Sequence, residues 1–223
     1  ALEEYLKKNQ LDAYFEDLNW IKNNSALIKE IPNIIQNISE FLIIYDFLAG
    51  ISNIFCSVHN YPDISENISI ENSSNLFIEN PQPISFNLGT DIRCSILTGA
   101  NSGGKTTFLE HVIQIITLLN LGLPVFGKAS IPVFSEVYYF AKNKGTASGG
   151  AFETLLTQMS KISPTENTLI LADEIEAITE PGVAGSIISA TAEYFISKNS
   201  YMIIATHLGH EIIKELPKKA RID

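Results

Sequence analysis

The stretch IRCSILTGANSGGKTT, which spans residues 92–107, decides the fold class of this chain. Its first six residues are mostly apolar and predict a buried strand. The eight residues that start at Gly99 match the pattern G-x-x-x-x-G-K-[ST]. A helix is predicted to follow from about Thr106 to Leu121, where Gly122 ends it. A strand before this pattern and a helix after it distinguish a phosphate-binding P-loop from an ordinary glycine-rich turn. The sequence therefore predicts an α/β P-loop domain.

The residue types in this loop suit the binding of nucleotide phosphates. Glycines let backbone N–H groups turn toward phosphate oxygens, and the N-terminus of the following helix adds positive potential there. Lys105 can place its charge on the β- and γ-phosphates during catalysis, and the Thr106 hydroxyl can ligate Mg²⁺. The predicted nucleotide-binding residues of the loop are Gly99, Ala100, Asn101, Ser102, Gly103, Gly104, Lys105, Thr106 and Thr107.

A second predicted strand supplies acidic groups. Thr168 to Ala172 reads as a buried strand, and it is followed directly by Asp173 and Glu174. The carboxyl end of a parallel strand faces the crevice in which such sheets bind ligands. Asp173 is therefore predicted to hold Mg²⁺ through water, and Glu174 is predicted to be the general base that orients the attacking water.

A third predicted strand, Tyr201 to Ala205, ends in Thr206 and His207. His207 is placed where it could sense the γ-phosphate, and it is predicted to be catalytic. The combination of a P-loop, an Asp-Glu pair and a histidine at a strand end favours ABC-type ATPases over kinases and small GTPases. Because no N-K-x-D sequence is present, ATP is favoured over GTP. The remaining histidines are expected to be structural: His59, His111 and His210.

Composition sets the outer limits. The chain has 223 residues, of which 45% are apolar and 18% charged, as expected of a soluble globular protein with one α/β unit. With a net charge of −10 it should bind duplex DNA weakly by itself. No apolar run is expected to reach the roughly 18–20 residues of a membrane span, and the start lacks a signal-peptide pattern. Cys56 and Cys94 are expected to be reduced thiols in the cytoplasm.

The chain divides into stretches of different character. Residues 1–57 are predicted to form helices that act as a lever, with Pro32 interrupting the helical pattern. Residues 58–223 are predicted to be the ATPase domain. Within it, 58–90 is expected to be a small β subdomain that includes a strand-like segment at Asn75–Ile78, and 91–223 is expected to be the P-loop core with a parallel sheet.

These motifs together resemble the ATPase domain of the MutS family of DNA mismatch-repair and recombination proteins. The resemblance rests on LTGANSGGKTT at 97–107, LADEI at 171–175 and ATH at 205–207, and it covers about residues 58–210. It implies that Asn101 assists the phosphates. It also implies that Phe77, in the segment FIENP, stacks on the adenine; the alternative is a core aromatic on a strand.

The resemblance to ABC-type ATPases also implies that ATP lies between two subunits, with a signature segment of one capping the γ-phosphate held by the other. The candidate is SGGAFET, residues 148–154, before a predicted helix at 155–162. Two registers are open. Ser148 and Gly149 match the general ABC signature, whereas ungapped comparison with MutS places Thr154 at the capping position.

The sequence thus predicts a Mg²⁺-dependent ATPase domain of a MutS-related protein. It is expected to be cytoplasmic and DNA-associated, to form homodimers through the ATPase domains, and to act on DNA through parts of its parent largely outside this chain. The abrupt start and end indicate a piece of a longer protein. Two alternatives stay open: an SMC-like chromosome-maintenance ATPase head, and a nucleotide-gated dimerisation module with negligible turnover.

Overall fold

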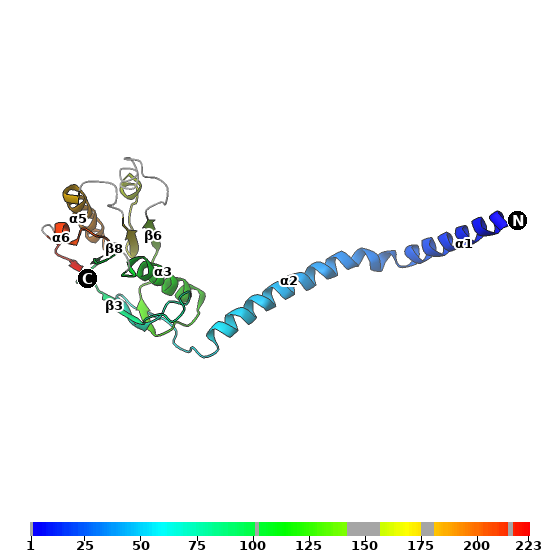
Figure 1. Cartoon of the computed structure of the whole chain (residues 1–223), viewed down its shortest axis with the longest axis horizontal. Helices are drawn as coiled ribbons and strands as arrows, with labels where there is room; N and C mark the ends of the chain where they lie inside the picture. Colours follow the sequence, from blue (N-terminus) through cyan, green and yellow to red (C-terminus); the bar gives the residue numbers. More distant parts are fainter. Residues whose placement is uncertain (1, 101–102, 142–156, 175–180, 214–215) are drawn as a thin grey trace. The chain divides into compact units, whose positions relative to one another are not determined.

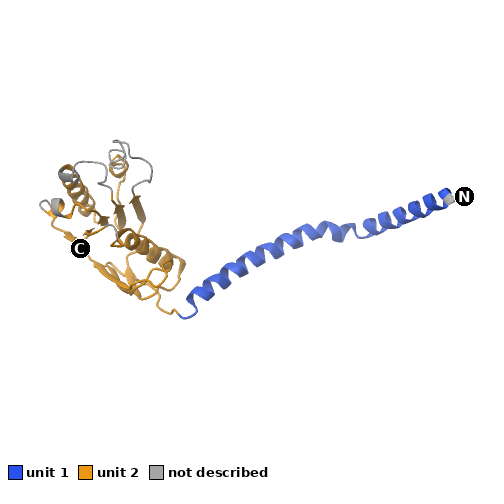
Figure 2. Cartoon of the chain, in the orientation of Figure 1, with its two compact units in different colours: residues 1–57 blue, residues 58–223 orange. Residues whose placement is uncertain are grey.

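The structure, a computed structural model, describes residues 2–100, 103–141, 157–174, 181–213 and 216–223. Two compact units make up the chain, Ala1–Ser57 and Val58–Asp223 (Figure 2). Among the residues that the structure describes, the first unit contains helices and no strands, and the strands lie in the second unit.

The first unit consists of α1 (Leu2–Asn23) and α2 (Ser25–Phe55) (Figure 1). The break between them falls at Asn24, whose side-chain Nδ2 donates to the carbonyl oxygen of Trp20 at 2.8 Å. Asparagine side chains compete with the helix for backbone hydrogen bonds, which favours a break at such a residue. The prediction that Pro32 interrupts the helix is wrong, because Pro32 lies inside α2. The hydrogen bond that its missing N–H forfeits is one of many in a 31-residue helix.

The helix α2 is also more apolar than expected. By length and composition it could cross a membrane, although no unbroken apolar run within it reaches the expected length of a span. The core helix of a soluble protein and a signal sequence pass the same test. A few charged residues, such as Glu40 and Asp46, divide α2 into shorter apolar runs, but the helix is apolar on average.

The second unit contains two sheets. The smaller sheet has the strand order β1-β5-β2-β3, built from β1 (Asp63–Ile64), β2 (Ile68–Ser73), β3 (Ile84–Leu88) and β5 (Lys128–Ile131). The strand β2 pairs antiparallel with both β3 and β5. Because β5 belongs to this sheet, the sheet includes residues outside the range 58–90 that was predicted for the β subdomain. Residues 75–78, which were expected to be strand-like, instead form turns and bends between β2 and β3.

The larger sheet is entirely parallel and has the order β6-β7-β8-β4-β9. Its strands are β4 (Cys94–Leu97), β6 (Glu136–Ala141), β7 (Thr168–Asp173), β8 (Tyr201–Ala205) and β9 (Ala220–Ile222). Every residue of β7 and β8 is buried, as expected for central strands covered on both faces. The predicted α/β class with a parallel core, a small β subdomain and preceding helices is confirmed.

Helices cover both faces of this sheet (Figure 1). Alternate residues of the central strands pack with α5 (Pro181–Ser197) and α6 (Gly209–Ile212) in one core: Cys94, Ile96, Ile170, Ala172, Met202, Ile204, Ile188, Ala192, Phe195 and Ile212. The intervening residues, such as Leu169 and Leu171, are equally buried, and α3 (Lys105–Leu121) contacts β7 and β8. Gly122 ends α3, as predicted. It adopts a left-handed conformation, and its N–H donates to the carbonyl oxygen of Leu119.

The strand order gathers the predicted motifs at one edge. The strand β4 lies between β8 and β9, and β8 lies between β4 and β7. In register, Leu97 is opposite Ala205, and Ala205 is opposite Asp173. The loop that follows β4 therefore emerges beside the residues that follow β7 and β8, because parallel strands end at the same edge of the sheet.

Candidate functional site

The loop between β4 and α3 has a backbone that requires glycine. Gly99 has φ 131° and Gly104 has φ 76°, both in the range that side chains disfavour. The N–H of Gly103 donates to the carbonyl oxygen of Ala100 at 2.9 Å, and a Cβ at Gly103 would lie 3.0 Å from the same oxygen. Gly104 is the N-cap of α3. The loop thus places glycine backbone directly at a helix N-terminus, which is a favourable site for phosphate oxygens.

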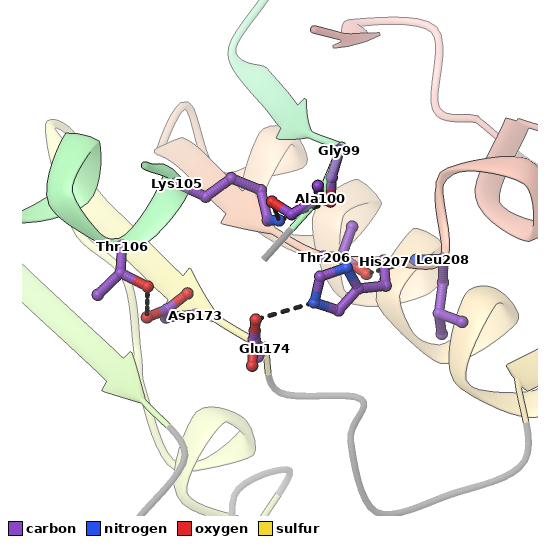
Figure 3. A network of polar contacts seen from close by, with 9 residues as sticks. All are labelled: Gly99, Ala100, Lys105, Thr106, Asp173, Glu174, Thr206, His207 and Leu208. Atoms are coloured by element: carbon purple, nitrogen blue, oxygen red, sulfur yellow. Dashed lines mark hydrogen bonds and ion pairs between the residues drawn. The ribbon is translucent and has the colours of Figure 1, made fainter. Parts of the chain in front are cut away.

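Lys105 begins α3 and turns its ammonium group back onto this loop (Figure 3). Its Nζ donates to the carbonyl oxygens of Gly99 at 2.7 Å and Ala100 at 2.9 Å, and the residue is only 8% exposed. A buried ammonium group needs such partners, because burial without them is very unfavourable. Lys105 therefore places a positive charge beside Gly99 and Ala100, at the start of the loop.

The side chains of Thr106, in the first turn of α3, and Asp173, at the end of β7, contact each other. The Thr106 hydroxyl donates to Asp173 Oδ2 at 2.7 Å (Figure 3), and Asp173 is 7% exposed. The other carboxylate oxygen, Oδ1, is buried and has no hydrogen-bond partner among the described residues. A buried carboxylate oxygen without a partner, beside a hydroxyl oxygen, suits a hard cation with oxygen ligands. These two residues therefore fit the Mg²⁺ role predicted for them.

Glu174 follows Asp173 in an unusual conformation. Its φ is 47°, a left-handed value that is uncommon outside glycine and asparagine, and its N–H donates to the carbonyl oxygen of Ala205 at 2.9 Å. Glu174 Oε1 lies 2.8 Å from His207 Nε2 (Figure 3), and the two side chains are 30% and 38% exposed. Strained backbone of this kind is concentrated at functional sites. The predicted base and the predicted phosphate sensor thus contact each other.

The segment that carries His207 is tied to the P-loop strand. The N–H of the buried Thr206 donates to the carbonyl oxygen of Leu97 at 3.0 Å, and the Thr206 hydroxyl accepts from the N–H of Leu208. Gly209 then packs against Thr98, where a Cβ would come within 2.5 Å of the threonine methyl group. A glycine at this position lets the chain run close to the start of the P-loop, which brings His207 to the same edge as Lys105.

Tyr139, on β6, was missed in the sequence. Burial raises the pKa of the Tyr139 phenol, and the negative charges of Asp173 and Glu110 raise it further. In register, Tyr139 is opposite Leu171, two residues before Asp173, so strand alternation places Tyr139 and Asp173 on one face of the sheet. Strand alternation could have placed Tyr139 on the same face as Asp173, but only if the pairing of β6 with β7 had been known.

A cavity of about 400 Å³ adjoins the P-loop. Its walls come from the P-loop and α3 on one side and from the loop between β2 and β3 on the other; they include Gly103, Gly104, Thr107, His111, Asn75 and Pro81. Phe77 belongs to the same β2–β3 loop and is 90% exposed. The alternative that Phe77 is a core aromatic on a strand is therefore wrong, and its predicted stacking role remains a prediction.

Some predicted site residues lie outside the described part of the chain. They are Asn101 and Ser102 in the P-loop, and Ser148, Gly149 and Thr154 in the signature segment. The described P-loop residues, with Asp173, Glu174 and His207, come together at one edge of the sheet. Among the described residues, no cluster of three or more His, Cys, Asp or Glu could hold a metal ion. The metal-binding role at this edge thus rests on a hydroxyl and one carboxylate.

Comparisons with known proteins identify relatives of this chain. No protein-family model matches the chain. The chain is 35% identical to the DNA-binding protein MutS2 of Pyrococcus furiosus over 97% of its own length and 41% of that protein. It is 28% identical to the endonuclease MutS2 of Lactobacillus helveticus and 25% identical to that of Borreliella burgdorferi, over 85% of the chain in both cases. It spans 26% and 25% of those two proteins, so it matches less than half of each of these relatives. The chain is a MutS-related protein.

Proposed function

We propose that this chain binds Mg·ATP and hydrolyses it. The observation that carries the proposal is the meeting of three groups at one sheet edge: the buried Lys105 ammonium in a glycine-rich loop, the Thr106–Asp173 pair and the Glu174–His207 pair. Phosphate transfer to water needs a phosphate cradle, a cation site and a base, and these groups match those needs in turn. Steady-state phosphate release from the purified chain with Mg·ATP tests the proposal and separates it from a binding module with negligible turnover.

In the proposed mechanism the P-loop residues hold the triphosphate. Backbone N–H groups of the loop and of the first turn of α3 bind phosphate oxygens, and Lys105 neutralises charge on the β- and γ-phosphates. Thr106 would hold Mg²⁺ through its hydroxyl, and Asp173 would hold it through water. When bound, Mg²⁺ neutralises the charge that builds up on the phosphate oxygens and helps to orient them.

Glu174 is the proposed general base. Its carboxylate can take a proton from a water molecule in line with the γ-phosphate, and His207 holds that carboxylate through the 2.8 Å contact. The backbone hydrogen bond from Glu174 N–H to Ala205 fixes the turn in which the carboxylate sits. The same histidine can contact the γ-phosphate, so it would link the position of the base to the presence of the phosphate.

We further propose that ATP joins two copies of this chain. The groups described above approach the phosphates from one subunit, and a γ-phosphate would be better covered by donors from a second subunit. Residues 148–154 supply hydroxyls and glycines suited to that task. A ligand that binds the dimer more tightly than the monomer shifts the equilibrium toward the dimer.

In a Glu174→Gln background, Mg·ATP should therefore raise the dimer fraction measured by sedimentation, and Mg·ADP should raise it less. Replacing Ser148 or Thr154 with a bulky residue should remove this response while ATP affinity of the monomer stays within about threefold, or ~0.7 kcal/mol. Equal monomer fractions with ATP, with ADP and without nucleotide would refute the ATP-linked dimer.

DNA is the proposed partner of the longer protein, since relatives carry the names DNA-binding protein MutS2 and endonuclease MutS2. Motion of the ATPase units would be passed to DNA-handling parts largely outside these residues. This chain should itself bind duplex DNA no more tightly than the non-specific range of ~10⁻⁴–10⁻⁶ M at physiological salt, because its net charge is −10. Fluorescence anisotropy with a labelled duplex measures this affinity. A sub-micromolar dissociation constant at physiological salt would contradict the expectation.

The similarity to MutS2 proteins also favours a DNA-associated, cytoplasmic ATPase of the MutS type over an SMC-like head. An SMC-like head would be expected to carry long coiled-coil arms with sustained heptads. The long helix α2 is apolar on average and carries few charged residues, which differs from such an arm.

A further inference from the structure

Four side chains form a continuous line of hydrogen bonds between α3 and the β2–β3 loop, and we call them the α3 polar chain: Ser73, His111, Gln114 and Asn75. The Ser73 hydroxyl lies 2.9 Å from His111 Nε2, and His111 Nδ1 lies 3.2 Å from Gln114 Oε1. Gln114 Nε2 donates to Asn75 Oδ1 at 3.3 Å. Ser73, His111 and Gln114 are all buried, with 0%, 3% and 8% exposure.

The direction of each hydrogen bond follows from the backbone groups at the end of the chain. Gln114 Oε1 accepts from the N–H of Leu76 at 3.0 Å, so it is the acceptor toward His111 as well. His111 must then carry its proton on Nδ1, and its Nε2 must accept from the Ser73 hydroxyl. Burial lowers the pKa of His111, which favours this neutral ring. One pattern of donors and acceptors thus satisfies the whole line.

The α3 polar chain ends on the backbone around Phe77. Asn75 Oδ1 accepts from the N–H of Phe77 at 2.9 Å, and Gln114 accepts from the N–H of Leu76. The N–H of Ser74 still donates to the carbonyl oxygen of Phe126, but among the described residues no strand pairs with 75–83. Instead, hydrogen bonds to the side chains of Gln114 and Asn75 hold the backbone at Leu76 and Phe77. The turn that bears Phe77 is therefore attached to α3 by side chains.

The same helix starts at the phosphate end of the site. Lys105 opens α3, while His111 and Gln114 lie about 1.7 and 2.5 turns further along the helix. The cavity of about 400 Å³ lies between these parts, with Gly104 and Thr107 in one wall, Asn75 and Pro81 in another, and His111 also in contact with it. A group attached to phosphates on the P-loop could enter this cavity. The distance between the phosphate site and the turn of Phe77 is then set by α3 and its polar chain.

We propose that Gln114 is a positioning residue for the base of the nucleotide. By holding the backbone of Leu76 and Phe77 against α3, it sets the cavity wall and the aromatic ring to which a base would bind. Gln114 contributes in this way to the affinity for ATP but not to the affinity for the triphosphate group alone. This inference rests on the proposed ATP binding.

The test compares two ligands in calorimetric titration, Mg·ATP and Mg²⁺ with inorganic triphosphate. Gln114→Met keeps the length of the side chain and removes its hydrogen bonds. It should weaken ATP binding about tenfold while triphosphate affinity changes less than about twofold, since the loss of one to two net hydrogen bonds is of that size. Gln114→Glu keeps the acceptor for Leu76 and loses the donor to Asn75, so its loss for ATP should be smaller.

Thr117→Val is the matched control, because Thr117 is exposed on the same helix and its hydroxyl donates to the carbonyl oxygen of Ile113 within α3. It should leave both affinities unchanged. Ser73→Ala removes the donor to His111 Nε2 and leaves Gln114 itself intact. It should lower ATP affinity alone, by less than Gln114→Met does, and it provides a second variant if Gln114→Met fails to fold.

A double-mutant cycle with Phe77→Ala links the polar chain to the ring. If Gln114 acts by positioning Phe77, the double variant should lose no more ATP affinity than the more damaging single variant, because the two changes remove one interaction. If the fold loss of ATP affinity in the double variant equals the product of the two single losses, the inference is overturned. Equal losses for ATP and triphosphate in Gln114→Met would also overturn it, because they would indicate a general structural role.

The wild-type protein separates this inference from the function on which it rests. Failure of the wild type to bind either ligand would refute the proposed ATP binding. Binding of ATP with unchanged affinity in Gln114→Met would refute the positioning role alone.

Discussion

Replacing Glu174 with glutamine should lower the steady-state rate of ATP hydrolysis by a factor of about 10²–10⁴ while Mg·ATP still binds. The glutamine amide can hold a water molecule but cannot accept its proton. It can still reach His207, since an amide oxygen accepts a hydrogen bond as the carboxylate does at 2.8 Å. The change therefore removes the proposed base with little change in the surrounding geometry, and phosphate release under saturating ATP measures the effect.

Glu166→Gln is the control for that substitution. Glu166 is exposed just before β7 begins at Thr168, whereas Glu174 follows its other end, so the same change in charge is made at the opposite edge of the sheet. The Glu166→Gln variant should hydrolyse ATP at the wild-type rate. Hydrolysis at the wild-type rate by Glu174→Gln would show that another group takes the proton.

Lys105→Ala should weaken Mg·ATP binding at least tenfold, or about 1.4 kcal/mol. The ammonium group is buried and directed at the loop carbonyls, so it is already ordered where phosphate charge is expected and little entropy is lost on binding. The substitution also removes a buried charge, so the folded structure should persist. Calorimetric titration gives the dissociation constant directly.

The control here is Lys198→Ala, at an exposed position just after α5. It removes the same charge from the protein without touching the loop. If both variants bind ATP like the wild type, the assignment of a phosphate-binding role to Lys105 is wrong. Equal weakening in both would instead indicate a general effect of net charge, which salt screens.

The parallel core was predictable because its signals are local. Four consecutive apolar residues before Asp173, and five residues from Tyr201 before Thr206, each form a short run that is buried on both faces. A glycine with φ 65° ends α3 where the sequence placed the end. In each case the amino acids that form the element also determine its boundary, so one stretch of sequence was sufficient.

Other features depend on partners that are distant in sequence. The strand β5 has four residues, and its own pattern does not show that it pairs with β2 instead of joining the parallel sheet. Phe77 lies in a run that reads as a strand, but no strand in the described part of the chain pairs with it. His111 and Gln114 look like ordinary helix residues until Ser73 and Leu76, both 38 residues away, are seen beside them.

The pairing of β4 has a consequence for the order in which the protein can fold. Both neighbours of β4, the strands β8 and β9, are more than 100 residues later in the chain, and the strands that come next in sequence pair elsewhere. Contacts between such distant segments form slowly, because a long loop must be closed before they contribute stability. During synthesis on the ribosome, the strand that leads into the P-loop therefore stays without a pairing partner until β8 has emerged. We expect the ability to bind nucleotide to arise late in synthesis, after most of the second unit has been made.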